Sequence, residues 1–318
     1  MAEVPIQRHR LDNGLRVILS RDPRAPVVAV NLWYDVGSKH EKAGKTGFAH
    51  LFEHMMFQGS ANVEKGQHFS LIQAAGGTLN ASTWLDRTNY YETLPGHELE
   101  LALWLEADRM ASLLPAMTQE KLDNQRDVVK NERRWSVDNQ PYGDWDELIQ
   151  ALVYPEGHPY HHSTIGSMED LSAASLDDVR EFFATYYAPN NAVLTIAGDF
   201  EADAALDMVR RHFGPIPPNN ELPPPPDMTV DPLIGSEVRE TKPDQVPLPR
   251  IYWAHRAPPF GTDEFDALDV AADVLGSGRA SRLYASLVRE QRLAQDVSVF
   301  AFPIVGGASL FTLWATAR

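Results

Sequence analysis

Two histidines one helical turn apart, with a glutamate beside the second, form the segment of this sequence best suited to chemistry. The segment reads His50-Leu51-Phe52-Glu53-His54. On an α-helix, residues three and four positions apart share a face, so the two imidazoles and the carboxylate project to one side. Histidines at this spacing can bind zinc, and the carboxylate can accept a proton from a water molecule at the metal. The alternative is a helix whose two histidines are hydrogen-bonded in a core.

The residues around this motif predict that it is helical. Apolar side chains such as Leu51 and Met55 recur at helical spacing. Thr46 can cap the N-terminus with its hydroxyl, and Gly59 can end the helix because glycine tolerates a left-handed conformation. We therefore expect a helix that begins after Thr46 and ends before Gly59.

A second helix can complete a metal site. A catalytic zinc usually has three protein ligands and one position open to water. The predicted helix over residues 119–137 carries Gln125 and Glu132, seven residues apart and therefore on one side. Val128 and Val129 of the same helix are expected to pack inward. Glu132 is the candidate for the third ligand.

The composition excludes several kinds of site and partner. The chain has 318 residues, no cysteine and a formal net charge of −16. Without cysteine there are no disulfides and no thiolate ligands, so a metal site must use histidine and carboxylate. The negative charge argues against nucleic acid, which binds basic surfaces. It favours cationic peptides, although an acidic surface often serves only solubility.

Neither a membrane span nor an export signal is expected. No apolar run reaches the length that crosses a bilayer, and the N-terminal residues lack the apolar stretch of a signal peptide. We therefore expect a cytoplasmic protein with no membrane partner.

The order of strand and helix patterns predicts an α+β fold with an internal repeat. Strand patterns cover residues 15–19, 27–32, 78–82, 88–94 and 192–197, and helical patterns cover 98–114, 119–137, 145–152 and 176–186. Prolines then cluster between residues 214 and 232, which is typical of an extended linker. After it the order of elements starts again, with strands near 250–253, 297–302 and 308–314.

We therefore expect two homologous α/β domains, each a mostly antiparallel sheet flanked by helices. The expected boundaries are 1–214 for a catalytic, metal-binding domain, 215–240 for the Pro-rich linker and 241–318 for the start of a second domain. The second copy has acidic residues where the histidine helix would lie: Asp266, Asp269 and Asp273. We expect this second domain to be non-catalytic and truncated.

The motif and the third acidic residue together resemble a known family. Glu132 follows His54 by 78 residues, in a predicted helix that ends near Pro141-Tyr142-Gly143. With the His-x-x-Glu-His run, this arrangement resembles the insulinase/pitrilysin family of inverzincin zinc metallopeptidases, in its processing-peptidase-like bacterial branch. Further segments that resemble the family are 77–81, 88–91, 157–160 and 187–191.

The resemblance implies a zinc centre with one Zn²⁺ per chain. His50, His54 and Glu132 would be its ligands, and Glu53 would be the catalytic base. Many relatives carry a glutamate near the metal where this chain has Gln125. Because Gln125 can hydrogen-bond but cannot titrate, we expect it to keep metal binding while changing its strength or the acidity of the water.

The resemblance also implies a peptide-binding strand. Asn80, Ala81 and Ser82 would hold the substrate backbone as an added strand, which favours extended or unfolded peptides. The alternative is an ordinary edge strand that faces solvent.

Relatives with a complete site often carry an arginine, and a tyrosine seven residues later, that grip the substrate. The segment around Arg289 resembles this region, but Asp296 stands where the tyrosine would be. A partner chain in a homo- or heterodimer, or a fused second half, is therefore expected to supply the Arg/Tyr grip.

The leading interpretation is a zinc endopeptidase that hydrolyses short or extended peptides in a chamber formed with a partner half. The alternative is a non-catalytic structural or assembly subunit of a peptidase-like complex, since some family members have lost the metal motif. The intact motif counts against that alternative. Metal-dependent chemistry on a non-peptide substrate has only the metal site in its favour.

Overall fold

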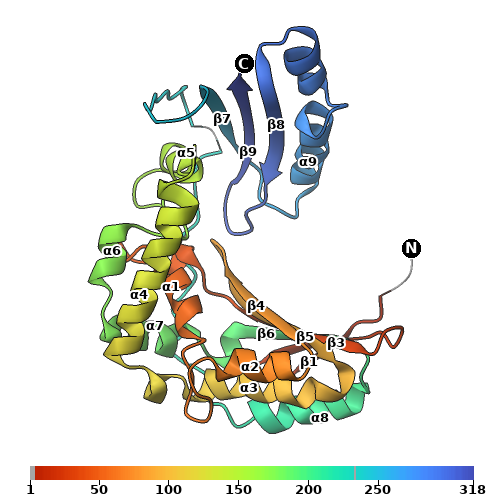
Figure 1. The fold of residues 1–318 in the computed structure, drawn as a ribbon. Coiled ribbons are helices and arrows are strands. Elements are labelled where there is room, and N and C mark those ends of the chain that lie inside the picture. The colour runs from red at the N-terminus through yellow and green to blue at the C-terminus, as the bar shows by residue number, and fades with distance from the viewer. Residues whose placement is uncertain (1–3, 233) are drawn as a thin grey trace. The chain divides into compact units, whose positions relative to one another are not determined.

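The computed structural model describes residues 4–232 and 234–318. Contacts divide the chain into two compact units. The first unit consists of the residues up to Asn131 together with Thr164–Pro225, and the second unit consists of Glu132–Ser163 together with Pro226–Arg318. Each unit combines a β-sheet with helices (Figure 1). The predicted α+β class is confirmed.

The first unit contains a six-stranded sheet in the order β1-β2-β6-β3-β5-β4. Its strands are β1 (Gln7–Arg10), β2 (Arg16–Arg21), β3 (Val27–Tyr34), β4 (Thr78–Thr83), β5 (Thr88–Pro95) and β6 (Ala192–Gly198). Neighbouring strands are antiparallel except β2 and β6. Strand β3 alternates in exposure and turns Val28, Val30 and Leu32 into the core. Strand β4 pairs with β5 and lies at an edge.

Helices surround this sheet. They are α1 (Phe48–Met55), α2 (Gln67–Ala74), α3 (Leu99–Ser112), α4 (Gln119–Arg133), α6 (Met168–Ala173), α7 (Leu176–Tyr186) and α8 (Ala202–Phe213). Figure 1 shows α2, α3 and α8 running along the sheet. Helix α1 lies against β4 and β5, which places the motif helix next to the edge strand.

The second unit repeats part of this arrangement. Its sheet has the order β7-β9-β8, with antiparallel strands β7 (Arg250–Ala257), β8 (Ala294–Phe302) and β9 (Ser309–Ala317). Its helices are α5 (Trp145–Val153) and α9 (Asp263–Gly276), followed by a π-helical segment at Tyr284–Glu290. The order β7-β9-β8 matches β3-β5-β4 of the first unit: α9 and the π-helical segment lie between β7 and β8 in the chain, as α1 and α2 lie between β3 and β4. The predicted internal repeat is confirmed.

Three local predictions are wrong. Helix α1 begins after Gly47, and Thr46 does not cap it, because the backbone N–H and the hydroxyl of Thr46 both donate to Asp170, over 2.9 and 2.6 Å. Gly59 does not end the helix, because α1 already stops at Met55, one turn earlier. Val128 is 40% exposed rather than packed inward.

The inward face of α4 explains the last error. Leu122, Gln125 and Val129 are its buried residues, and they follow the three- and four-residue spacing of one helix face. Val128 stands three residues after Gln125 but about a third of a turn away from Leu122, so it lies at the margin of that face. The following residues, Arg134–Asp138, continue the helix predicted up to residue 137 as a π-helical turn.

The proline-rich region has no regular structure. Among the described residues between α8 and β7, none belongs to a helix or a strand. A helix that could cross a bilayer, with the necessary length and apolar composition, is not found in the described part of the chain.

Candidate metal centre

Helix α1 brings two candidate metal ligands together. The Nε2 atoms of His50 and His54 lie 3.3 Å apart, and the two rings are almost perpendicular, at 89°. Both side chains are half-buried. Because the residues stand one turn apart on one helix, α-helical geometry sets their separation.

The other face of α1 anchors the helix in the core. Leu51, Phe52 and Met55 are fully buried. The ring of Phe52 packs 5.5 Å from the ring of Phe182 on α7 and 4.4 Å from the ring of Tyr187 just after it. Removing such an aromatic side chain from a core costs about 3–5 kcal/mol. The anchor therefore fixes the direction in which both histidines point.

The start of α1 is held by a residue outside the helix. The carboxylate of Glu41 accepts hydrogen bonds from the backbone N–H groups of Gly47 (2.9 Å) and Ala49 (2.7 Å). A carboxylate there satisfies N–H groups that lack a partner within the helix, and it interacts favourably with the helix dipole. Gly47 has φ of +81°, and a Cβ atom at this position would lie 2.5 Å from the backbone oxygen of Ile165. Only glycine fits this turn without strain.

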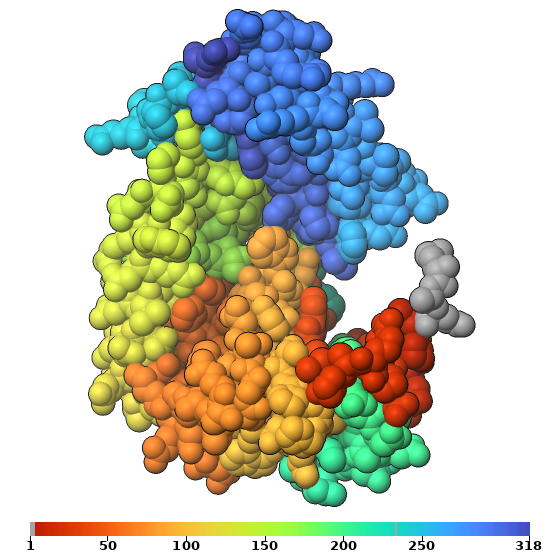
Figure 2. Space-filling view, turned by 45° about the vertical axis from the view of Figure 1, so that its right-hand side comes forward, coloured from red at the N-terminus to blue at the C-terminus, as the bar shows by residue number. Residues whose placement is uncertain are grey.

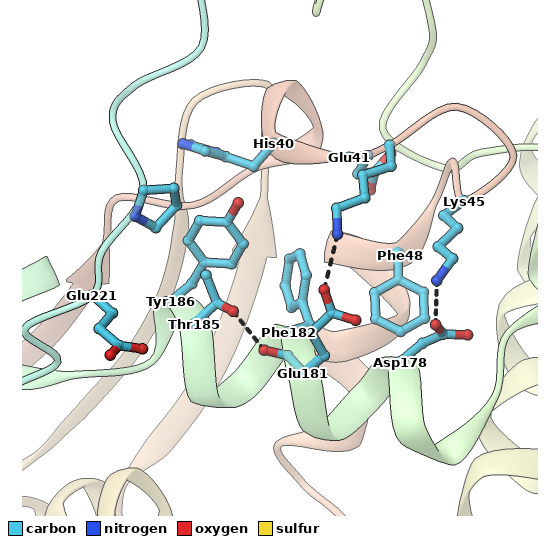
Figure 3. A pocket seen from close by; sticks show the side chains of 12 residues that line it. His40, Glu41, Lys45, Phe48, Asp178, Glu181, Phe182, Thr185, Tyr186 and Glu221 are labelled. Atoms are coloured by element: carbon cyan, nitrogen blue, oxygen red, sulfur yellow. Dashed lines mark hydrogen bonds and ion pairs between the residues drawn. The ribbon is translucent and has the colours of Figure 1, made fainter.

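Ion pairs connect the same loop to helix α7. Lys42 contacts Glu181 at 2.8 Å, and Lys45 contacts Asp178. Figure 3 shows the pair of Lys45 and Asp178 at the pocket beside the start of α1, together with the ring of Phe48. Since exposed ion pairs each contribute little free energy, we attribute to them the orientation of the loop rather than the stability of the unit.

Helix α4 carries the third candidate ligand. The helix begins in the first unit and runs without a break to Arg133. Glu132 lies in its last turn and is half-buried. Glu132, His50 and His54 each offer one ligand atom, and these atoms all lie within 4.8 Å of one another. The fold therefore brings together three residues that are separated by up to 82 positions in the sequence.

The donor set fits zinc. Two imidazole nitrogens and one carboxylate oxygen are a ligand set that catalytic zinc sites use. Two ligand atoms at about 2.0–2.1 Å from a tetrahedral zinc lie about 3.3 Å apart. The Nε2–Nε2 distance of His50 and His54 is also 3.3 Å. The residues present can therefore hold the metal without rearrangement of α1.

Glu53 is oriented by a residue that sequence reasoning missed. The hydroxyl of Thr83, at the end of β4, donates a hydrogen bond of 2.6 Å to Oε2 of Glu53. Thr83 is buried, and it follows Leu79 and Ala81 on the face of β4 that packs toward the core. The sequence feature that could have identified Thr83 is its hydroxyl on the inward face of the next strand after the motif helix.

Gln125 is buried on α4, on the same face as Leu122 and Val129. Its side-chain amide donates a hydrogen bond of 3.0 Å to Asn124. Its effect on a metal stays a prediction.

Strand β4 presents the candidate substrate-binding residues at the sheet edge. Asn80 is exposed, and its Oδ1 accepts a hydrogen bond of 2.9 Å from the backbone N–H of Ala81. The hydroxyl of Ser82 donates to Asn89 over 2.7 Å, and Arg87 donates to the backbone oxygen of Ser82 over 2.9 Å. In Figure 2 the orange surface belongs to the part of the chain that contains β4 and β5. The edge is thus solvent-accessible, and its polar groups are held by local side chains.

Fold and site together define a metallopeptidase-like protein of two related domains. Residues 16–154 match the family model described as insulinase (peptidase family M16), and residues 173–318 match the model described as the peptidase M16 inactive domain. The chain belongs to the insulinase family, peptidase family M16.

Similar proteins carry the name zinc protease. Zinc protease PqqE of Helicobacter pylori is 33% identical over 311 residues, which are 93% of this chain and 69% of that protein. An uncharacterized zinc protease of Mycobacterium leprae is 29% identical over 290 residues, 91% of this chain and 64% of that protein. A crystal structure of a protease from Helicobacter pylori superposes with a TM-score of 0.92 at 30% identity, over 99% of this chain and 75% of that one. The chain thus spans about two thirds of the length of these curated relatives.

Proposed function

We propose that this chain is the zinc-binding part of a metalloendopeptidase that hydrolyses peptide bonds in short or extended peptides. The observation that carries this proposal is the convergence of His50, His54 and Glu132, with Glu53 on the same helix as the two histidines. The names of its relatives support the same class of enzyme.

The three ligands and Glu53 divide the chemistry between them. A zinc ion held by His50, His54 and Glu132 would supply Lewis-acid polarisation of the scissile carbonyl and of the attacking water. Glu53 accepts the proton of that water and returns it to the nitrogen of the leaving amine. The hydrogen bond from Thr83 to Oε2 of Glu53 holds the carboxylate in one orientation during both transfers.

The edge of β4 binds the substrate in this proposal. An extended peptide adds to an exposed strand through backbone hydrogen bonds. Asn80, Ala81 and Ser82 supply the groups, and the peptide replaces Oδ1 of Asn80 as the acceptor for the N–H of Ala81. Binding through the backbone explains why extended chains are preferred and folded ones are excluded.

A partner half completes the enzyme. Asp296 on β8 accepts a hydrogen bond of 2.9 Å from Thr316 on β9, so this residue joins two strands of its own sheet. At the position where relatives carry the substrate-gripping tyrosine, this chain therefore has Asp296, which makes a hydrogen bond within its own sheet. We infer that a second chain, in a homo- or heterodimer, or a fused second half supplies the grip and closes the chamber.

The experiment compares the chain with Glu53→Gln on a quenched peptide library, and determines zinc in both. Removing a general base lowers the rate by about 10²- to 10⁴-fold. We expect that loss in Glu53→Gln with zinc content unchanged, and no loss in the exposed control Glu64→Gln. Unchanged cleavage in Glu53→Gln would exclude Glu53 as the base.

The same experiment separates the peptidase from the alternative, a non-catalytic assembly subunit. Zinc with no cleavage by the isolated chain leads to repetition in the presence of a second half, supplied as a fused or a separate partner chain. Absence of zinc after the metal has been supplied supports the assembly subunit.

A further inference from the structure

A second group of potential metal ligands is enclosed in the first unit. It consists of His68 on α2, Glu92 on β5 and Glu106 on α3, with exposures of 4%, 1% and 0%. One ligand atom from each lies within 4.8 Å of the others. The group shares no residue with the candidate metal centre on α1 and α4.

The charges in this group are unbalanced. Arg109, also fully buried, donates to both carboxylate oxygens of Glu106, with a distance of 3.0 Å from Nε to Oε2. One guanidinium therefore offsets one of two carboxylates. An unpaired buried carboxylate is costly, so a proton or a cation must neutralise Glu92.

The contacts of Glu92 and His68 favour a cation. Within the described chain, neither carboxylate oxygen of Glu92 has a hydrogen-bond partner among the fixed donors and acceptors. The same is true of Nε2 of His68. Nε2 of His68 lies 3.8 Å from Oε1 of Glu92 and 4.0 Å from Oε1 of Glu106. These distances are too long for hydrogen bonds. The acceptor beside a proton on Glu92 would be Glu106, whose two carboxylate oxygens already accept hydrogen bonds from Arg109.

These distances lie slightly above the separation of two atoms that bind one tetrahedral metal ion. Ligands at about 2.0–2.2 Å from such a metal lie about 3.3–3.6 Å apart, so a shift of a few tenths of an ångström in these side chains would close the site. One imidazole nitrogen with carboxylate oxygens is a donor set for zinc or manganese(II). Carboxylates that bind metals are themselves hydrogen-bonded, and Arg109 fills that role for Glu106.

We propose that His68, Glu92 and Glu106 bind a second divalent transition-metal ion. The site is enclosed, which is typical of structural rather than catalytic metals. A metal here would tie α2, α3 and β5 together, directly beside the edge strand β4. Its binding would therefore stabilise the unit that carries the candidate catalytic centre.

The test uses a chain in which the first centre has been removed by His50→Ala with His54→Ala. After loading with zinc or manganese(II) and desalting, we expect about one metal ion per chain to remain, because the second site is independent. Adding Glu92→Gln, which keeps the shape of the side chain, should remove it. Glu64→Gln, an exposed change, should not.

Two readouts keep the test decisive if Glu92→Gln does not fold. X-ray absorption of the metal in the His50→Ala/His54→Ala chain should show one imidazole among oxygen ligands. Zinc or manganese(II) should also raise the Tm of that chain, and a chelator should reverse the rise. No retained metal and no shift in Tm would overturn the proposal and leave a proton as the neutralising charge. Because the first centre is absent, this result does not depend on peptidase activity.

Discussion

The two units share a strand order but differ in the helix that follows its first strand. After β3 comes α1 with His50 and His54, and after β7 comes α9 with five exposed acidic residues. Among them are Asp266, Asp269 and Asp273. The same framework thus carries two candidate metal ligands in one unit and a solvated helix face in the other. The comparison shows that chemistry is added to a common fold by a few side chains.

The two helices also begin differently. Helix α9 has a local cap, because the hydroxyl of Thr262 accepts a hydrogen bond of 3.2 Å from the N–H of Phe265. Helix α1 begins at a left-handed glycine, Gly47, and its first N–H groups are satisfied by Glu41. The helix that carries the candidate ligands is therefore positioned by residues outside itself. We expect its geometry to be more sensitive to distant substitutions than that of α9.

The largest expected effect concerns the ligands themselves. His50→Ala should remove the metal from the first centre and lower peptide cleavage by about 10³-fold or more, because the Lewis acid is lost. Asp269→Ala on α9 should leave the metal content and the cleavage rate within about twofold of the unchanged chain, since exposed positions away from special features contribute little. Metal analysis and initial rates check this pair. Equal losses in both variants would contradict the functional difference between the units.

A smaller effect is expected in the loop before α1 at low pH. Burial and the nearby Lys39 lower the pKa of His40 from 6.5 to about 4. Because the folded-state pKa lies below the unfolded value, neutral His40 stabilises the fold above pH 6.5, and this contribution disappears as the pH falls toward 4. The free energy of unfolding should fall by about 3 kcal/mol over this range through His40.

Urea unfolding at pH 7 and pH 4.5 measures this contribution. His40→Gln should lose less stability between the two pH values than the unchanged chain. The matched control is His97→Gln, since the side chain of His97 is 79% exposed. Identical pH dependence in His40→Gln and the unchanged chain would argue against a buried neutral imidazole.

The two helix starts can be compared directly. Gly47→Ala should lower the free energy of unfolding by about 2 kcal/mol, because an L-residue is strained at this φ and its Cβ meets the backbone of Ile165. Thr262→Ala should cost about 1 kcal/mol through the lost cap. Denaturant unfolding gives both values, and zinc affinity should weaken only in Gly47→Ala. Equal zinc affinity in the two variants would show that α1 tolerates a displaced start.

A further effect concerns the orientation of Glu53. Thr83→Val removes a hydrogen bond to a charged group while keeping the shape of the side chain, and such bonds contribute about 1.5–3 kcal/mol. We expect kcat to fall about tenfold or more, with KM and metal content unchanged. Thr83→Ser should restore most of the rate. A fall in metal content, or no rescue by serine, would assign Thr83 a purely structural role.

Much of the fold could be predicted because local patterns agree with tertiary packing. The apolar run at 192–197 is strand β6, which lies between β2 and β3, and the long helix from Gln119 is α4. The periodic ligand spacing on α1 follows directly from helix geometry. These features depend on residues close together in the sequence.

The remaining features depend on residues far apart. Thr46 has a side chain that can cap a helix, but its hydroxyl donates a hydrogen bond to Asp170, which is 124 positions away. Glu92 reads as part of a strand, yet its burial opposite His68 and Glu106 arises only when α2, α3 and β5 pack together. Long-range competition of this kind overrides local preference, and no spacing rule reveals it.

The central claim is that α1 and α4 jointly hold zinc, and Glu132 tests it most directly. Zinc bound after desalting would be determined for the chain, for Glu132→Ala and for Glu120→Ala, an exposed change on the same helix. The account predicts that Glu132→Ala loses about one zinc per chain together with peptide cleavage, whereas Glu120→Ala keeps both. Equal zinc content in all three proteins would contradict it.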